Sequence, residues 1–226
     1  IAAGATHNDG NGTNSGHTRI YRWNGTAWNQ LGGDFDGEAA HDHSGSGVSL
    51  STDGNIVAIG ARYNDGNGEK SGHTRIYEWN SGSSSWNQRG SDIDGEAAED
   101  RSGETGVSLS GDGTLVAIGA HKNDANGINS GHTRVYQWDG SDWVQVGTDI
   151  DGEAAGDQSG YGVSLSRDGS TVAIGAKYND GNGEDSGHVR VFSLDTTAPT
   201  FSSAATNAAG TKVVLTYDET LSSTTA

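Results

Sequence analysis

Apolar and small polar residues alternate along residues 47–51, Gly-Val-Ser-Leu-Ser, as they do in a β-strand with one covered face. Next along the chain, residues 56–61 form a continuous apolar run, Ile-Val-Ala-Ile-Gly-Ala, which is typical of a strand buried on both faces. Asp53 and Gly54 lie between the two segments and favour a tight hairpin. The pattern therefore predicts two antiparallel strands in succession.

A third segment, residues 73–79, also has the two-residue period of a strand. Its sequence, His-Thr-Arg-Ile-Tyr-Glu-Trp, puts the histidine, the arginine and both aromatic residues on one face, with Thr74 and Ile76 on the other. A shorter segment at 86–88 follows and leads to an acidic loop. Four such antiparallel strands have the size of one propeller blade.

This four-strand pattern recurs, because two sequence markers interleave along most of the chain. The first marker, Gly-His-x-Arg, contains His17, His73, His132 and His188. The second marker, Asp-x-Asp-Gly-Glu-Ala-Ala, occupies residues 34–40, 92–98 and 149–155. Since the phase between the markers is constant, one unit of roughly 57 residues is repeated.

We therefore predict an all-β fold, a β-propeller-like array of four-stranded antiparallel blades that is incomplete at its ends. The repeat domain spans residues 1–194, with a partial blade at 1–44, blades at 45–103 and 104–160, and a partial blade at 161–194. About three and a half units lie at the lower edge of the four to eight blades usual for closed propellers. Closure then needs strand sharing, further repeats or neighbouring molecules. A stack of independent hairpins is the alternative, although an isolated hairpin is marginal in water.

The sequence changes character after Asp195, where the repeat ends. Residues 195–200 contain the single proline of the chain and are predicted to be an extended linker. Residues 212–217, Lys-Val-Val-Leu-Thr-Tyr, predict a strand. We interpret residues 195–226 as either the start of an immunoglobulin-like module or a strand donated to another subunit.

Composition narrows the classes of partner. The 226 residues include 37 glycines and only 31% hydrophobic residues, so each buried layer must be thin. The formal net charge of −17 repels phosphate backbones and anionic head groups, which argues against nucleic acid and membrane surfaces, and no apolar stretch is long enough for membrane insertion. The absence of cysteine excludes disulfides and thiolate metal sites. Because so much negative charge repels itself, a divalent cation is the first cofactor to consider.

Two kinds of acidic loop are candidates for calcium, which takes oxygen ligands from carboxylates, amides and backbone carbonyls. In the first kind, acidic and amide residues alternate on a glycine-rich loop: Asp9, Asn11, Asp65, Asn67, Glu69, Asp124, Asn126, Asp180, Asn182 and Glu184. The second kind gathers four carboxylates closely: Asp34, Asp36, Glu38 and Asp42; Asp92, Asp94, Glu96 and Asp100; Asp149, Asp151, Glu153 and Asp157. Alternatively, Asn-Asp-Gly is turn chemistry, and the carboxylates cap backbone amides or pair with arginines. Both loop kinds remain candidates at this point.

The repeated basic residues are predicted to be structural. The histidines His17, His73, His132 and His188 lie one blade apart beside arginines that oppose a cation, which favours hydrogen bonding or stacking over a transition-metal array. The arginines expected to pair with carboxylates between blades are Arg19, Arg75, Arg134 and Arg190.

Catalysis has little support in the sequence. Every candidate serine, histidine or aspartate recurs once per repeat, whereas an active site normally needs residues that break the symmetry, so we expect no enzyme. His41 and His43 have no counterparts in the other repeats and are interpreted as a surface variation, with metal binding as the alternative.

The segments Ser51–Tyr77 and, with conservative changes, Ser166–Phe192 share the pattern Ser-x-Asp-Gly-x-x-Val-Ala-Ile-Gly-Ala-x-x-Asn-Asp-Gly-Asn-Gly-x-x-Ser-Gly-His-x-Arg-Val-Tyr. This pattern resembles the FG-GAP repeats of integrin-like β-propellers, especially the version found in tandem in very large bacterial surface and adhesin proteins. Residues 195–226 are similar to the immunoglobulin-like repeat that follows such arrays. The resemblance implies an extracellular binding or scaffold role with calcium in loops between strands, although these loops lack the full Asp-x-Asp-x-Asp-Gly-x-x-Asp set.

Together these observations predict an extracellular or cell-surface protein, bacterial in origin, that serves adhesion or scaffolding and is stabilised by Ca²⁺. Its expected partners are a protein or glycan surface ligand, or neighbouring copies of itself. One alternative is a structural subunit of an extracellular filament or surface layer, completed by neighbouring subunits. A second alternative is a carbohydrate-active enzyme.

Overall fold

The computed structural model describes residues 1–195, 201–206 and 213–217. Every regular element in this part of the chain is a β-strand, and the strands pair in antiparallel sheets, which confirms the predicted all-β, propeller-like class. The chain divides into two units, residues 1–194 and residues 195–226. None of the described residues belongs to a helix that could cross a membrane.

Two sheets form the N-terminal part of the first unit. The first contains β1 (Ala2–Ala5), β2 (His17–Trp23) and β3 (Trp28–Gln30) in that order, with β4 (Phe35–Asp36) paired to β2. The second contains β5 (Ser44–Leu50), β6 (Ile56–Ala61), β7 (His73–Asn80) and β8 (Ser85–Gln88), with β9 (Ile93–Asp94) paired to β7. Strand β6 coincides with the predicted apolar run, and β5 and β7 overlap the alternating segments on either side of it.

Two further sheets repeat this topology. The third contains β10 (Val107–Leu109), β11 (Leu115–Ala120), β12 (His132–Trp138) and β13 (Trp143–Gln145), with β14 (Ile150–Asp151) paired to β12. The fourth contains β15 (Ser159–Leu165), β16 (Thr171–Ala176) and β17 (His188–Ser193). In the second unit, β18 (Phe201–Thr206) pairs with β19 (Val213–Tyr217), where the sequence predicted a strand. Except for Asp195, the linker predicted at 195–200 lies outside the described residues, and the immunoglobulin-like interpretation stays a prediction.

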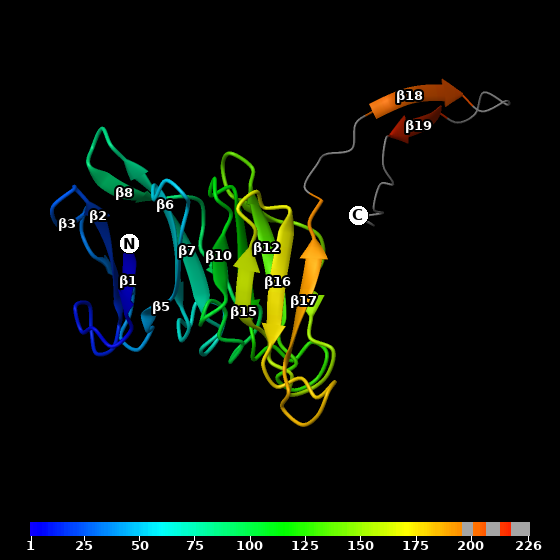
Figure 1. Ribbon diagram of the computed structural model, residues 1–226, viewed down its shortest axis with the longest axis horizontal. Coiled ribbons are helices and arrows are strands. Elements are labelled where there is room, and N and C mark those ends of the chain that lie inside the picture. The colour runs from blue at the N-terminus through cyan, green and yellow to red at the C-terminus, as the bar shows by residue number, and fades with distance from the viewer. Residues whose placement is uncertain (196–200, 207–212, 218–226) are drawn as a thin grey trace. The chain divides into compact units, whose positions relative to one another are not determined.

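The four sheets of the first unit lie face to face in chain order, from the blue strands to the orange β17 in Figure 1. Each neighbouring pair shares an apolar core, whose members include Ile20 and Val57, Ile76 and Ile118, and Val135 and Ile174, respectively. Burying an aliphatic side chain of this size contributes about 1.5–3 kcal/mol. A thin apolar layer is therefore sufficient for each sheet, because the next sheet covers it. The sheets are not independent hairpins.

Glycines allow neighbouring sheets to approach at the backbone. A Cβ atom built on Gly119 would lie 2.0 Å from the carbonyl oxygen of Gly160 in the next sheet, and one on Gly60 would lie 2.0 Å from that of Gly103. Gly175 has the same repeat position in the fourth sheet, yet its built Cβ would have no atom nearer than 3.6 Å. The outer face of the fourth sheet is thus open where the equivalent faces of the second and third sheets are covered.

Candidate functional site

The first kind of acidic loop connects β1 to β2 in the first sheet and the second strand to the third in the other three sheets, and its aspartate orders the loop. Asp65 Oδ1 accepts a hydrogen bond of 2.8 Å from the backbone N–H of Lys70. The equivalent bonds join Asp9 to Asn14, Asp124 to Asn129 and Asp180 to Asp185. Glu69 contacts Lys70 Nζ at 3.0 Å, and Glu184 is exposed. One oxygen of each loop aspartate therefore stabilises the turn by accepting a backbone hydrogen bond.

An asparagine in the first loop joins it to the second loop of the same sheet. Nδ2 of Asn67 donates to the backbone oxygens of Gly95 and Glu96, at 2.9 and 3.0 Å. The equivalent residues in the first and third sheets are Asn11 and Asn126. Asn182 of the fourth sheet is exposed. In the first three sheets the two loops thus form a single acidic edge, a name we keep for each such pair of joined loops.

The glutamate of the second loop reaches across to the next sheet. Glu38 Oε1 accepts a hydrogen bond of 3.2 Å from Arg75 Nη1, and Glu38 Oε2 lies 3.9 Å from His73 Nδ1. In the next two positions, Glu96 lies 3.6 Å from Arg134 and 3.7 Å from His132, and Glu153 lies 3.7 Å from both Arg190 and His188. We call each boundary that contains this glutamate, arginine and histidine a seam.

The seam arginines also bond to the backbone of the preceding sheet. Arg75, Arg134 and Arg190 donate to the carbonyl oxygens of Asp36, Asp94 and Asp151, respectively. No sheet precedes the first one among the described residues, and there Arg19 Nη2 instead pairs with Asp34 at 2.8 Å. This hydrogen bond lowers the pKa of Asp34 to about 2. The arginine therefore bridges two sheets wherever a preceding sheet exists.

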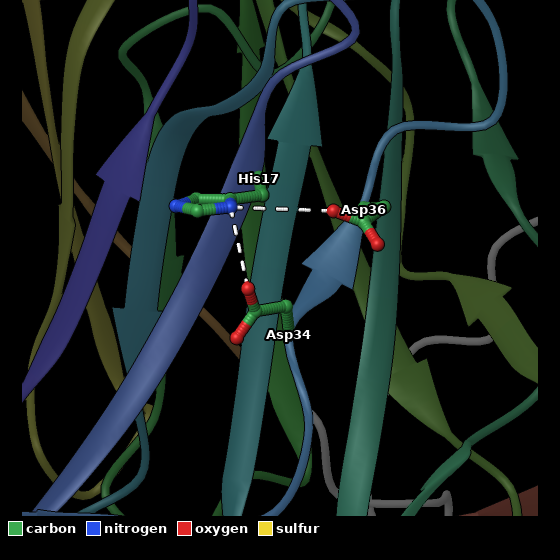
Figure 2. A group of neighbouring side chains, drawn as sticks. All are labelled: His17, Asp34 and Asp36. Atoms are coloured by element: carbon green, nitrogen blue, oxygen red, sulfur yellow. Dashed lines mark ion pairs between the residues drawn. The ribbon is translucent and has the colours of Figure 1, made fainter. Parts of the chain in front are cut away.

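Each of three histidines also faces an aspartate of its own sheet. Figure 2 shows His17 with Asp34 and Asp36, whose carboxylate oxygens lie 3.6 and 4.0 Å from Nδ1. Two similar groups are Glu38, His73 and Asp92, and Glu96, His132 and Asp149. Within each group, one ring nitrogen and two carboxylate oxygens lie within 4.8 Å of one another, so these residues could hold a metal ion.

Burial controls the charge of the groups at the seams. It lowers the pKa of His73 to about 4, and the positive charge of Arg75 acts in the same direction. Burial likewise lowers the pKa of His132 and raises that of Glu96. Neutral imidazoles and carboxylates therefore lie together in a partly dehydrated environment.

Among the described residues, the second aspartate of the Asp-x-Asp-Gly-Glu marker faces a histidine only in the first sheet, where Asp36 lies 4.0 Å from His17. In the second sheet the equivalent Asp94 lies against the first loop instead. A Cβ built on Gly66 would lie 2.8 Å from Asp94 Oδ1 and 3.0 Å from Asn64 Oδ1, so both oxygens lie against the first loop. Burial and the charge of Asp92 raise the pKa of Asp94. Its equivalents are Asp36, which also lies against a first-loop glycine, and Asp151, which is exposed.

The last aspartate of each second loop forms a buried pair that sequence analysis did not identify. Asp100 Oδ2 accepts hydrogen bonds from Ala97 N and from Asn123 Nδ2, both at 3.0 Å. The equivalent side-chain bonds join Asp42 to Asn64 at 3.2 Å and Asp157 to Asn179 at 2.8 Å. The signal in the sequence was an asparagine immediately before each first-loop aspartate, in phase with the acidic marker.

One histidine without a counterpart in other repeats is also buried. His43 is 8% exposed, and its ring meets those of His7 and Tyr63 edge-on at 4.9 Å. Burial lowers its pKa. The interpretation of His41 and His43 as a surface variation is therefore wrong for His43, because its ring packs between neighbouring aromatic rings.

Residues 36–77 and 148–192 match the family model of the FG-GAP repeat. FG-GAP repeats are propeller-like and generally non-catalytic, and they occur in extracellular and surface proteins. Each matched segment runs from the second loop of one sheet to the third strand of the next, so it contains one complete seam. A search of the curated proteins found no match.

Proposed function

We propose that this chain is a non-catalytic scaffold or adhesion segment of a bacterial cell-surface protein, made rigid by Ca²⁺ on its loops. The observation that carries the proposal is the acidic edge, at which an asparagine joins two acidic loops in each of three successive sheets. The repeat match supports the surface location, since FG-GAP repeats occur in surface proteins.

Asp94 is the strongest single candidate for a calcium ligand on the acidic edge. Its carboxylate is half-buried and accepts no hydrogen bond from the described residues, and its pKa is raised. The amide oxygen of Asn64 lies against the same glycine. Calcium prefers carboxylate and amide oxygens, and a bound cation would relieve the repulsion between Asp94 and Asp92.

A surface groove gives the proposed adhesion role a candidate ligand site. It has a volume of about 570 Å³ and lies between the β7–β8 hairpin of the second sheet and the turn that follows β12 in the third sheet. Its walls include Trp79, Trp138 and Arg89, together with the amides of Asn87 and Gln88. Aromatic faces beside a few hydrogen-bonding groups suit a protein or glycan ligand.

The calcium proposal is tested by thermal unfolding of the metal-stripped chain, followed by addition of millimolar Ca²⁺. Because an ion that binds the folded state alone stabilises it, we expect the melting midpoint to rise by several degrees. The variant Asp94→Asn should show a smaller rise, whereas Glu78→Gln, at an exposed acidic residue of β7 outside both kinds of loop, should respond like the wild type. A midpoint that calcium leaves unchanged contradicts the proposal.

A filament or surface-layer subunit is a second candidate, favoured by the open face of the fourth sheet. Val189 and Val191 are 66% and 65% exposed, whereas Thr133 and Val135 at the same repeat positions are buried. A neighbouring molecule could cover this face as the next sheet does elsewhere. Analytical ultracentrifugation over a range of concentrations distinguishes the two functions: concentration-dependent assembly supports the subunit, and a monomer throughout contradicts it.

A further inference from the structure

The seam between the second and third sheets contains a buried histidine without hydrogen bonds. The side chain of His132 is 0% exposed, and neither of its ring nitrogens has a hydrogen-bond partner among the described residues. A buried polar atom is rarely left unpaired in a folded protein. The ring therefore needs a partner that the protein's own donors and acceptors do not supply.

Two carboxylates approach the unpaired Nδ1 of His132 at a distance that suits a shared ion. Asp149 Oδ2 lies 3.6 Å from Nδ1, and Glu96 Oε2 lies 3.7 Å from it. Both distances exceed those of a hydrogen bond. A tetrahedral zinc ion, with ligands at about 2.0–2.1 Å, holds its ligand atoms about 3.3 Å apart. Small side-chain movements would thus bring all three atoms into coordination.

The seam arginine, Arg134, does not occupy the space between His132 Nδ1 and Glu96 Oε2. Arg134 Nη1 lies 3.6 Å from the other oxygen of Glu96, Oε1, and Nη2 donates to the carbonyl oxygen of Asp94 at 2.6 Å. The guanidinium therefore occupies the far side of the glutamate, while Oε2 faces the imidazole. The arginine orients Glu96 and still leaves one of its oxygens for an ion.

The same set recurs at the preceding seam. His73 is 1% exposed, and its Nδ1 lies 3.6 Å from Asp92 and 3.9 Å from Glu38. In the first sheet, where no described sheet precedes to supply the glutamate, the third acid is Asp36 of the same sheet at 4.0 Å, so that group would not link two sheets (Figure 2). His188 has Glu153 beside it, but the described part of the chain supplies no matching aspartate. Complete sets thus occur at two seams.

We propose that each of these two seams binds a divalent transition-metal ion such as Zn²⁺, through the histidine Nδ1, the aspartate of the same sheet and the glutamate of the preceding sheet. Imidazole nitrogen suits zinc and its neighbours, whereas calcium takes oxygen ligands, so this site is distinct from the acidic edge. Water completes the coordination. Since the ligands come from two sheets, the ion links consecutive sheets.

The test titrates the metal-stripped full chain with Zn²⁺ by calorimetry and with Co²⁺ followed by its visible absorption. Relative to the wild type, we expect one strong site fewer in His132→Gln, one fewer in His73→Gln and two fewer in the double variant. The control His121→Gln changes a buried histidine outside the seams and should keep both sites. If a histidine variant is unfolded by circular dichroism, Glu96→Gln and Asp149→Asn, which retain the ring, should each remove one site.

A zinc stoichiometry that is unchanged in the double variant, or a folded wild-type chain that binds no zinc, would overturn the proposal. The calcium proposal has a separate readout, because its melting response depends on Asp94. If the wild-type chain lacks the two zinc sites but calcium still raises its melting midpoint, only the zinc proposal fails. If the two zinc sites are present but calcium leaves the midpoint unchanged, only the calcium proposal fails.

Discussion

Asp100 and Asn123 form a buried hydrogen bond of 3.0 Å between the second and third sheets. Asp100 belongs to the second loop of one sheet, and Asn123 precedes the first loop of the next, so the pair fixes the two sheets at their loop ends. Water is excluded from this position, since the two side chains are 3% and 5% exposed. A buried pair of this kind is costly to break, because the remaining partner cannot find a substitute.

Replacing Asp100 by alanine should lower the free energy of unfolding by about 1–3 kcal/mol, because it leaves Asn123 Nδ2 and Ala97 N unpaired. Urea denaturation followed by tryptophan fluorescence measures the change. The matched control is Glu184→Gln, at an exposed acidic residue, for which we expect a change close to zero. Equal effects of the two substitutions would show that the buried pair does not stabilise the seam.

His121 should make the protein sensitive to mild acid. Burial and the positive charge of Lys122 lower its pKa to about 3, whereas the unfolded chain has the ordinary value of 6.5. The unfolded state therefore binds a proton that the folded state does not, and stability falls as the pH drops below 6.5, by at most about 1.4 kcal/mol per pH unit. The carboxylate of Glu104 lies 3.4 Å from His121 Nε2 through Oε2, while its Oε1 accepts a hydrogen bond of 3.0 Å from Arg62, so its charge is shared with the arginine.

We expect His121→Gln to lose less stability than the wild type between pH 7 and pH 5, as measured by urea denaturation at each pH. His41→Gln, at an exposed histidine, should leave the pH dependence unchanged. A His121→Gln curve parallel to that of the wild type would contradict the assignment of a buried neutral imidazole.

At the scale of elements, the strand covered on both faces was the most predictable. A continuous apolar run can be stable in water only if both faces are covered, and β6 is buried along its whole length. Strand β10 was less predictable: it has three residues, whereas β5 and β15 have seven. The segment before it contains one more residue than its equivalents, and Glu104 there pairs with Arg62 and His121. Strands β4, β9 and β14, of two residues each, are too short for a period to show.

The candidate site could be predicted in part. The acidic residues were identifiable because they recur in phase, but their partners lie on the neighbouring sheet. Glu38 meets His73 and Arg75 only because consecutive sheets stack in a particular register. A sequence pattern fixes which face of a strand a residue occupies, but it does not fix how two sheets are placed against each other. The seams could therefore be recognised only in three dimensions.

Two equivalent glycines test the close approach of sheets. Gly119→Ala should destabilise the protein by about 1–3 kcal/mol, because the new methyl group would overlap the backbone of Gly160. Gly175→Ala places the same group at the same repeat position, where the nearest atom is 3.6 Å away, so we expect little change or a slight gain. Thermal unfolding of both variants provides the comparison. Equal tolerance at the two positions would contradict the contact between the third and fourth sheets.

At the scale of the first unit, each sheet is expected to depend for its stability on the sheets packed against it. Each inner sheet contributes one apolar face to the core before it and another to the core after it, as in repeat proteins in which neighbours stabilise one another. The described strands form no closed barrel, so the row has two ends. An inner sheet is covered on both faces, and the fourth sheet is covered on one.

Amide hydrogen exchange measured on dilute protein tests this arrangement most directly, by comparing β11 with β16. Both strands have bonded strands on either side, and β16 has five paired residues with β15 where β11 has three with β10, so backbone pairing alone would not make β16 exchange faster. All six residues of β11 are buried, whereas those of β16 alternate between half-buried and buried. We expect amides of β16 to exchange distinctly faster than those of β11. Equal protection of the two strands would contradict the account in which each sheet depends on the next to cover it.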